Sequence, residues 1–186
     1  MVVEALKMAL RKTDKKYCTL SQIDYSRIEM NSSTKELLKE KKYLERPFAY
    51  EFYHQLRTLM DNSNVNFGGP IIQAEVDKRY QHCFENGKIP DFIIHMPNDS
   101  KNLAVIEFKL ANNLGKLEHD FKKLVRFKEN EDLKYSHAIE VIIGNESSLT
   151  LAKERIMQLN KHMGLEITII EFNTDSWEVN DWIIRY

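Results

Sequence analysis

The spacing of apolar residues along the chain changes near position 71, from the period of a helix to that of strands. Before this point, apolar side chains recur three or four residues apart in PFAYEFYHQLRTLM (47–60), which predicts a helix that starts at its proline. A second, highly charged helix is predicted over KELLKEKKYLE (35–45), with Ser33 or Thr34 as its cap. After this point, turn residues separate three runs of strand composition: IIQAEVDKRY (71–80), DFIIHM (91–96) and NLAVIEFKL (102–110).

The rest of the chain alternates between helical and strand patterns. Helices are predicted near 116–129 and 148–163, and strands at 137–144, 165–172 and 177–186. Strands separated by helices pair in parallel, whereas the three earlier runs follow one another closely enough to pair antiparallel. The sequence therefore predicts an α/β fold with a mixed central sheet that helices cover on both faces.

Length and charge pattern divide the chain into three segments. We expect residues 1–46 to form a charged helical N-terminal segment packed on the core, and residues 47–172 to form the core itself. Residues 173–186 would add a C-terminal strand or an interface segment. A chain of 186 residues is long enough to fold as one domain with a hydrophobic core.

Composition limits the class of protein. With 42% hydrophobic and 30% charged residues, the chain resembles globular proteins, and no apolar run approaches the roughly 20 residues that cross a bilayer. Its start lacks the features of a secretory signal, so we expect a cytoplasmic protein without membrane contact. Cys18 and Cys83 are isolated, which predicts neither a disulfide framework nor a zinc site. The net charge of −1 argues against a dedicated, tight DNA-binding protein but is compatible with a nucleic-acid enzyme.

Three charged residues interrupt the central strand runs. Glu107 and Lys109 follow the apolar stretch LAVI and alternate with apolar neighbours, so both point to one face of their strand. Asp91 opens the preceding strand, and the length of the hairpin loop decides which residue it faces. A five-residue loop would set Asp91 opposite Glu107, and a three-residue loop would set it opposite Lys109. A four-residue loop would turn Asp91 to the other face of the sheet. Such a trio could bind a divalent cation and orient a water for attack on a phosphodiester. A solvated strand end with a surface ion pair is the simpler alternative.

The order of these residues resembles the motif of a known nuclease superfamily. Pro-Asp at 90–91 is followed by 15 residues and then by Glu-Phe-Lys at 107–109, which is similar to the PD-(D/E)xK nucleases, the restriction-endonuclease-like proteins. The predicted layout over residues 47–172 is similar as well: a helix, a strand hairpin that carries the motif, a helix, a strand and a helix. The resemblance therefore implies a restriction-endonuclease-like αβββαβ core.

The same resemblance implies a metal-dependent nuclease, for which we expect DNA rather than RNA as substrate. Asp91 and Glu107 would ligate Mg²⁺ or Mn²⁺, and Lys109 would serve the attacking water. Members often add a carboxylate from the first helix; Glu51 is the first candidate for that role and Glu45 the second. The helix after the motif lacks the Gln and Tyr, one turn apart, that some exonuclease branches carry, which favours endonucleolytic action.

Two alternatives to an active nuclease remain open from the sequence. The chain could be a catalytically silent nuclease-fold module that binds nucleic acid or a protein partner. It could also be a structural or regulatory subunit whose N-terminal helices dock on a partner. If the nuclease is active, we expect a homodimer, because cutting both strands of a duplex favours two sites related by a twofold axis.

Overall fold

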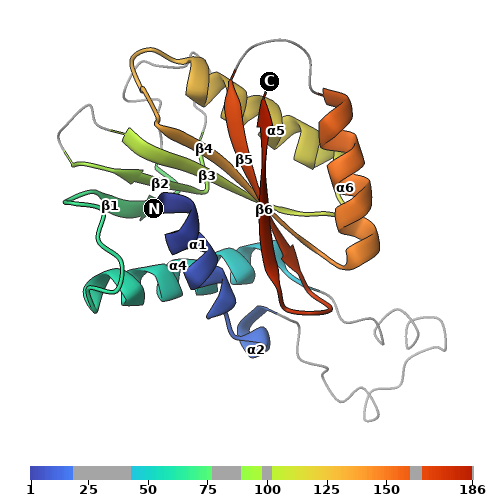
Figure 1. Cartoon of the computed structure of the whole chain (residues 1–186), viewed down its shortest axis with the longest axis horizontal. Coiled ribbons are helices and arrows are strands. Elements are labelled where there is room, and N and C mark those ends of the chain that lie inside the picture. Colours follow the sequence, from blue (N-terminus) through green and yellow to red (C-terminus); the bar gives the residue numbers. More distant parts are fainter. Residues whose placement is uncertain (19–42, 77–88, 98–101, 160–164, 186) are drawn as a thin grey trace, which may run out of the picture.

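The computed structural model of the chain describes residues 1–18, 43–76, 89–97, 102–159 and 165–185. Within these residues, six strands form one sheet in the order β1-β2-β3-β4-β5-β6 (Figure 1). The strands are β1 (Ile71–Ala74), β2 (Phe92–His95), β3 (Asn102–Leu110), β4 (His137–Gly144), β5 (Glu166–Asn173) and β6 (Val179–Arg185). The helices are α1 (Val2–Arg11), α2 (Lys15–Cys18), α4 (Glu45–Asp61), α5 (Leu114–Glu129) and α6 (Glu146–Leu159). The expected α/β class is confirmed.

The sheet combines antiparallel and parallel pairing, as predicted. β1, β2 and β3 pair antiparallel, β3, β4 and β5 pair in parallel, and β6 returns antiparallel to β5. Each parallel step passes through a helix, α5 between β3 and β4 and α6 between β4 and β5. These are the crossovers that parallel neighbours require.

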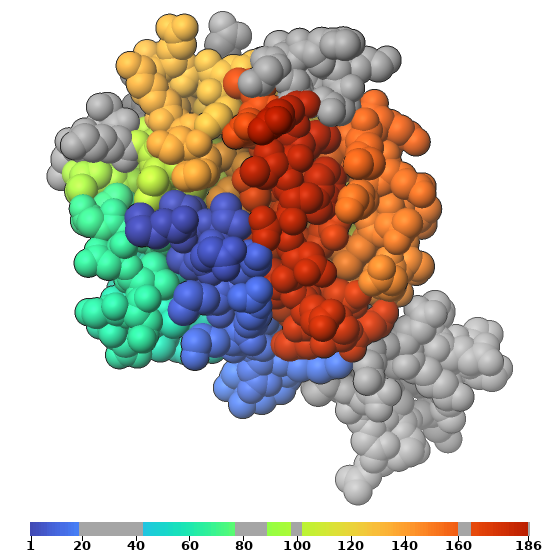
Figure 2. Space-filling model, in the orientation of Figure 1, coloured from blue at the N-terminus to red at the C-terminus, as the bar shows by residue number. Residues whose placement is uncertain are grey.

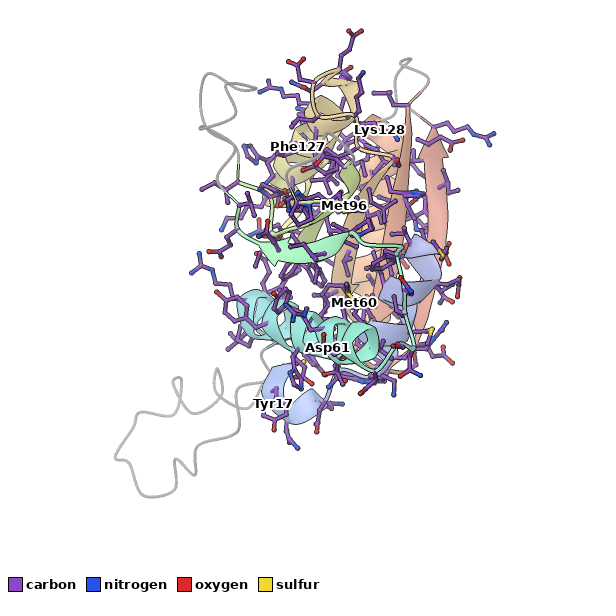
Figure 3. All side chains as sticks on the ribbon, turned by 90° about the vertical axis from the view of Figure 1, so that its left-hand side faces the viewer. Tyr17, Met60, Asp61, Met96, Phe127 and Lys128 are labelled. Carbon is purple, nitrogen blue, oxygen red and sulfur yellow. The ribbon has the colours of Figure 1, made fainter. Side chains whose placement is uncertain are left out.

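Helices cover both faces of the sheet, as Figures 1 and 3 show. On one face, α1 and α4 bury one core, in which Phe48 and Phe52 of α4 pack against Phe108 of β3. On the other face, α5 and α6 bury a second core over Ile93 of β2 and Val105 of β3. Successive residues of a strand alternate between faces, so the odd-numbered positions of β3 are directed to the layer of α5 and α6.

Several element bounds differ from those predicted. Helix α4 begins at Glu45, before the expected Pro47, because proline is tolerated within the first turn of a helix. Strand β1 ends at Ala74, and the later part of the strand predicted over 71–80 lies mostly outside the described residues. The charged helix predicted over 35–45 also falls largely outside them.

The described part of the N-terminal segment packs on the core. Helices α1 and α2 contact α4, and α1 also contacts β6, beside which it lies in Figure 2. Lys7 of α1 pairs with Glu4 and with Asp181 of β6, so α1 is tied to the edge of the sheet. No helix in the described residues is long and apolar enough to cross a lipid bilayer.

Candidate active site

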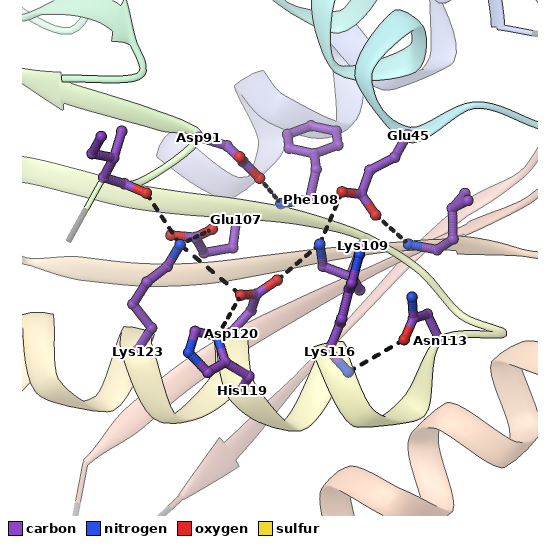
Figure 4. Close-up of polar contacts among 12 residues, drawn as sticks. Glu45, Asp91, Glu107, Phe108, Lys109, Asn113, Lys116, His119, Asp120 and Lys123 are labelled. Carbon is purple, nitrogen blue, oxygen red and sulfur yellow. Dashed lines mark hydrogen bonds and ion pairs between the residues drawn. The ribbon is translucent and has the colours of Figure 1, made fainter. Parts of the chain in front are cut away.

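Asp91 and Glu107 lie side by side because of the register between β2 and β3. Phe92 pairs with Ile106, and one further step in the same antiparallel register sets Asp91 opposite Glu107. This is the register expected for a five-residue loop, and a bulge nearer the loop leaves this part of the pairing unchanged. The backbone N–H of Phe108 donates a hydrogen bond of 2.7 Å to the Asp91 carboxylate, which holds that side chain at the site (Figure 4).

Lys109 follows on the same face of β3 and bridges two helices. Its Nζ lies 2.9 Å from Oε1 of Glu45 in α4 and 2.9 Å from Oδ2 of Asp120 in α5. Glu45 also accepts a hydrogen bond of 3.3 Å from the backbone N–H of Leu110. Burial lowers the pKa of Lys109, but the hydrogen bonds to Glu45 and Asp120 outweigh burial and raise the pKa above its usual value. Lys109 is therefore an ammonium at neutral pH.

A second lysine reaches the site from α5. Lys123 Nζ lies 2.7 Å from Oε2 of Glu107, 3.2 Å from the carbonyl oxygen of Ile89 and 4.0 Å from Oδ1 of Asp120 (Figure 4). Sequence reasoning did not single out Lys123, because it stands in a run of basic residues on a charged helix. Its spacing of three residues from Asp120 is the signal that was available, since residues three apart share one helix face.

Glu140 adds a carboxyl group that the sequence analysis also missed. The parallel register between β3 and β4 sets Glu140 beside Glu107. Glu140 is fully buried, and neither of its oxygens has a hydrogen-bond partner among the described residues. Oε1 of Glu107 is likewise buried without a partner there. The available signal was a single charged residue in the otherwise apolar run AIEVII (138–143), where a carboxylate costs free energy unless something compensates it.

The sequence analysis also missed Asp120, which is another acidic residue among apolar neighbours. Its helix was expected to bury a stripe of apolar residues, and Asp120 stands on that stripe between Leu117 and Phe121, both of which are buried. An acidic residue on the inner face of a helix needs a positively charged partner or water. Lys109 is that partner in the structure.

Burial also shifts the ionisation of the carboxyl groups. Removal from water raises the pKa of Glu107 well above its usual range, and the negative charge of Asp91 adds to the rise. The pKa of Glu140 is raised well above its usual range by burial and then by the charge of Asp120. Burial raises the pKa of Asp91 as well, although the hydrogen bond from Phe108 opposes it.

Glu45, and not Glu51, is the α4 carboxylate that the structure brings to Lys109. Glu51 is buried farther along the helix, where Gln55 donates a hydrogen bond of 2.8 Å to its Oε1. Burial raises the pKa of the Cys18 thiol, and the charge of Glu51 adds to this rise. The first candidate for the helix carboxylate is therefore replaced by the second.

A cleft opens beside Asp91 at the junction of α4 with β1, β2 and β3. Its lining residues are Glu45, Arg46, Ala49, Tyr50, Ala74, Glu75, Asp91, Phe92 and Phe108. Glu107 is not among them, because it is 1% exposed and its carboxylate is paired with Lys123. A ligand in the cleft therefore meets Asp91 and Glu45 first.

The cluster has more negative than positive groups. Its members in the described residues are five carboxyl groups and two ammonium groups: Glu45, Asp91, Glu107, Asp120 and Glu140, with Lys109 and Lys123. This excess, and the unpaired oxygen of Glu107 beside Asp91, suit a hard divalent cation, which prefers carboxylate oxygens. Among the described residues, however, no three acidic, histidine or cysteine side chains already form a group that could hold a metal ion. The donors fit the cation chemically, but the side chains must rearrange to enclose it.

Comparison of the chain with models of protein families, with curated proteins and with solved structures found no match.

Proposed function

We propose that this chain is a nuclease of the PD-(D/E)xK type that uses Mg²⁺ or Mn²⁺ to hydrolyse phosphodiester bonds, with DNA as its substrate. The observation that carries the proposal is the convergence of Asp91, Glu107 and Lys109 on one face of two adjacent strands. The order α4, β1, β2, β3, α5, β4 supports a restriction-endonuclease-like αβββαβ core within residues 47–172. Neighbouring carboxylates bind a hard cation, and an ammonium beside them complements the charge of a phosphate.

Each residue of the site has its own task in this proposal. Asp91 and Glu107 would hold the cation, which when bound supplies a polarised phosphodiester and a water of lowered pKa. Lys109, being protonated, donates a hydrogen bond to the attacking water or to the phosphate and does not take up a proton. Glu45 and Asp120 hold the Lys109 ammonium in position.

One observation favours the silent binding module as a second candidate. Lys123 already neutralises one oxygen of Glu107, and the described residues contain no closed metal group. In a binding module this ion pair would be a permanent part of the fold. In a nuclease the cation would compete with Lys123 for Glu107, because an ammonium and a divalent cation at one carboxylate repel each other.

Plasmid cleavage tests the proposal directly. We expect the wild-type chain to nick or linearise supercoiled DNA in Mg²⁺ or Mn²⁺ and to be inactive in EDTA. Replacing Lys109 by Ala should lower the cleavage rate by about 10²- to 10³-fold, the usual effect of removing one hydrogen-bond donor that stabilises developing charge.

Lys16→Ala is the control, since Lys16 of α2 also pairs with a carboxylate, Asp14, but lies outside the cluster. This variant should cleave at the wild-type rate. Cleavage that persists in EDTA or in Lys109→Ala would contradict the proposal. A folded wild-type chain that binds DNA or RNA without cutting either would favour the binding module.

A further inference from the structure

Glu140 is an ionisable residue without a hydrogen-bond partner in the described part of the fold. It lies in the middle of β4, between the buried residues Ile139 and Val141, and is itself 0% exposed. Neither of its carboxyl oxygens accepts or donates a hydrogen bond within the described part of the chain. Buried polar groups in proteins nearly always have a partner, so an exception of this kind needs an explanation.

The described surroundings of Glu140 offer no donor that would compensate its burial. Its neighbour on β3 is Glu107, whose Oε1 is also buried and unpaired among the described residues. Lys109 and Lys123 are near enough to act on Glu140 electrostatically, but both ammonium groups are paired with other carboxylates. Two adjacent buried carboxyl groups that share no donor destabilise a fold. An apolar residue of similar size at position 140 would lower the free energy of the folded chain relative to Glu140.

The position of the Lys123 ammonium indicates where a positive charge is stable in this cluster. It lies 2.7 Å from Oε2 of Glu107, while Oε1 of Glu107 and both oxygens of Glu140 have no hydrogen-bond partner among the described residues. Neighbouring side chains on one face of adjacent strands stand about 4.5–5.5 Å apart at their Cβ atoms, a separation that lets two carboxylates share one cation. A divalent cation that displaces Lys123 would meet Glu107 from one side and Glu140 from the next strand.

We propose that Glu140 is a third carboxylate ligand of the cation site, together with Asp91 and Glu107. This inference rests on the proposed cation-dependent function, and it extends the site to β4. It explains why a buried carboxyl group without a hydrogen-bond partner among the described residues lies beside Glu107. In the cation-free chain, the Lys123 ammonium would then supply the positive charge that the cation supplies when bound. The ligand class is a hard divalent metal ion, Mg²⁺ or Mn²⁺.

The test compares the full-length wild-type chain with Glu140→Gln, which removes the charge and keeps the size of the side chain. Thermal unfolding in EDTA should show a higher midpoint for Glu140→Gln than for wild type, because the uncompensated carboxyl group is gone. Calorimetric titration with Mn²⁺ should show an affinity at least about tenfold weaker in the variant, as for the loss of a metal-site residue. Mn²⁺ should therefore raise the unfolding midpoint of wild type more than that of the variant.

Glu171→Gln provides the control. Glu171 is a half-buried carboxylate on the neighbouring strand β5, where Trp182 donates a hydrogen bond to it. Its replacement should leave the affinity for Mn²⁺ unchanged.

Equal Mn²⁺ affinity in wild type and Glu140→Gln would overturn the inference while leaving Asp91 and Glu107 as ligands. A lower midpoint of Glu140→Gln in EDTA would also overturn it, because Glu140 would then have a structural partner. If the wild-type chain itself takes up no Mn²⁺, the proposed function fails together with the inference.

Discussion

The carboxyl groups of Glu107 and Glu140 leave water on folding without gaining a donor for every oxygen. The Lys123 ammonium reaches one oxygen of Glu107, and the Glu140 carboxyl group has no hydrogen-bond partner in the described part of the chain. Uncompensated burial of this kind costs stability, and proteins tolerate it mainly where function requires it. The same residues that support the proposed chemistry are therefore expected to weaken the cation-free fold.

We predict that the cation-free protein loses stability as the pH rises. The pKa of Glu107 and of Glu140 in the fold is well above the value of 4.5 that is usual for glutamate. Between the usual and the raised pKa, the folded chain binds more protons than the unfolded chain, so each step upward in pH lowers the free energy of unfolding. Urea unfolding in EDTA at about pH 5 and about pH 8 should show this loss, and Glu140→Gln should show a smaller one. Equal losses in both proteins would contradict the assignment.

The site residues differ in how far the sequence could predict them. Asp91, Glu107 and Lys109 were predictable because strand alternation and one hairpin register set them on a common face. Glu140 and Asp120 were not predicted, because their neighbours in the cluster come from other elements. Their placement depends on the parallel register of β3 with β4 and on the rotation of α5, which a single sequence does not specify.

At the scale of elements, α4 decides which carboxylate completes the site. Its first residue, Glu45, lies at the end of β3 and contacts both Lys109 and the N–H of Leu110. Helical spacing places Glu51 beside the apolar stripe, but it does not indicate which end of the helix meets the motif strands. The mixture of parallel and antiparallel pairing was predicted correctly, because it follows from the order of strands and helices along the chain. The position of each strand within the sheet was not predicted.

Two variants of α4 test this placement. Glu45→Gln should lower the rate of Mg²⁺-dependent cleavage by about 10- to 100-fold, because Lys109 loses a charged partner. A loss of this size is usual when a residue that orients an active-site group is replaced. Glu51→Gln should cleave nearly as wild type, since its recorded hydrogen bond is to Gln55 of the same helix. Rates measured on one plasmid substrate decide, and the reverse order of the two effects would restore Glu51 as the helix carboxylate.

At the scale of the molecule, the apolar residues of the C-terminal strand and of the N-terminal helices, which we expect to be available for a dimer contact, are partly used within the chain. Val179 and Ile184 of β6 are buried in the chain's own cores. Ile183 remains 55% exposed on β6, Met8 is exposed on α1, and the exposed Met1 precedes that helix. Helix α1 contacts β6 and lies beside it in Figure 2. Strand β6 also forms one edge of the sheet, where a second strand can pair.

We predict a homodimer that uses this surface of α1 and β6, with a self-complementary interface above about 1,000 Å². Light scattering at micromolar concentration should give twice the mass of the 22.0 kDa chain. Ile183→Asp should shift the protein to monomer, because it places a charge at the centre of an apolar contact. A monomer mass for wild type that added DNA and Ca²⁺ leave unchanged would reject the dimer without affecting the site.

Calorimetric titration of Asp91→Asn with Mn²⁺ shows whether Asp91 and Glu107 hold the cation on which we propose that cleavage depends. Asn retains an oxygen that can accept the hydrogen bond from Phe108, so the local fold is preserved while the charge is lost. We predict that the affinity for Mn²⁺ falls at least about tenfold in Asp91→Asn, as for loss of a metal-site residue. Asp61 is an exposed carboxylate at the end of α4, and the control variant Asp61→Asn should keep the wild-type affinity. Equal affinity of wild type and Asp91→Asn would contradict the account.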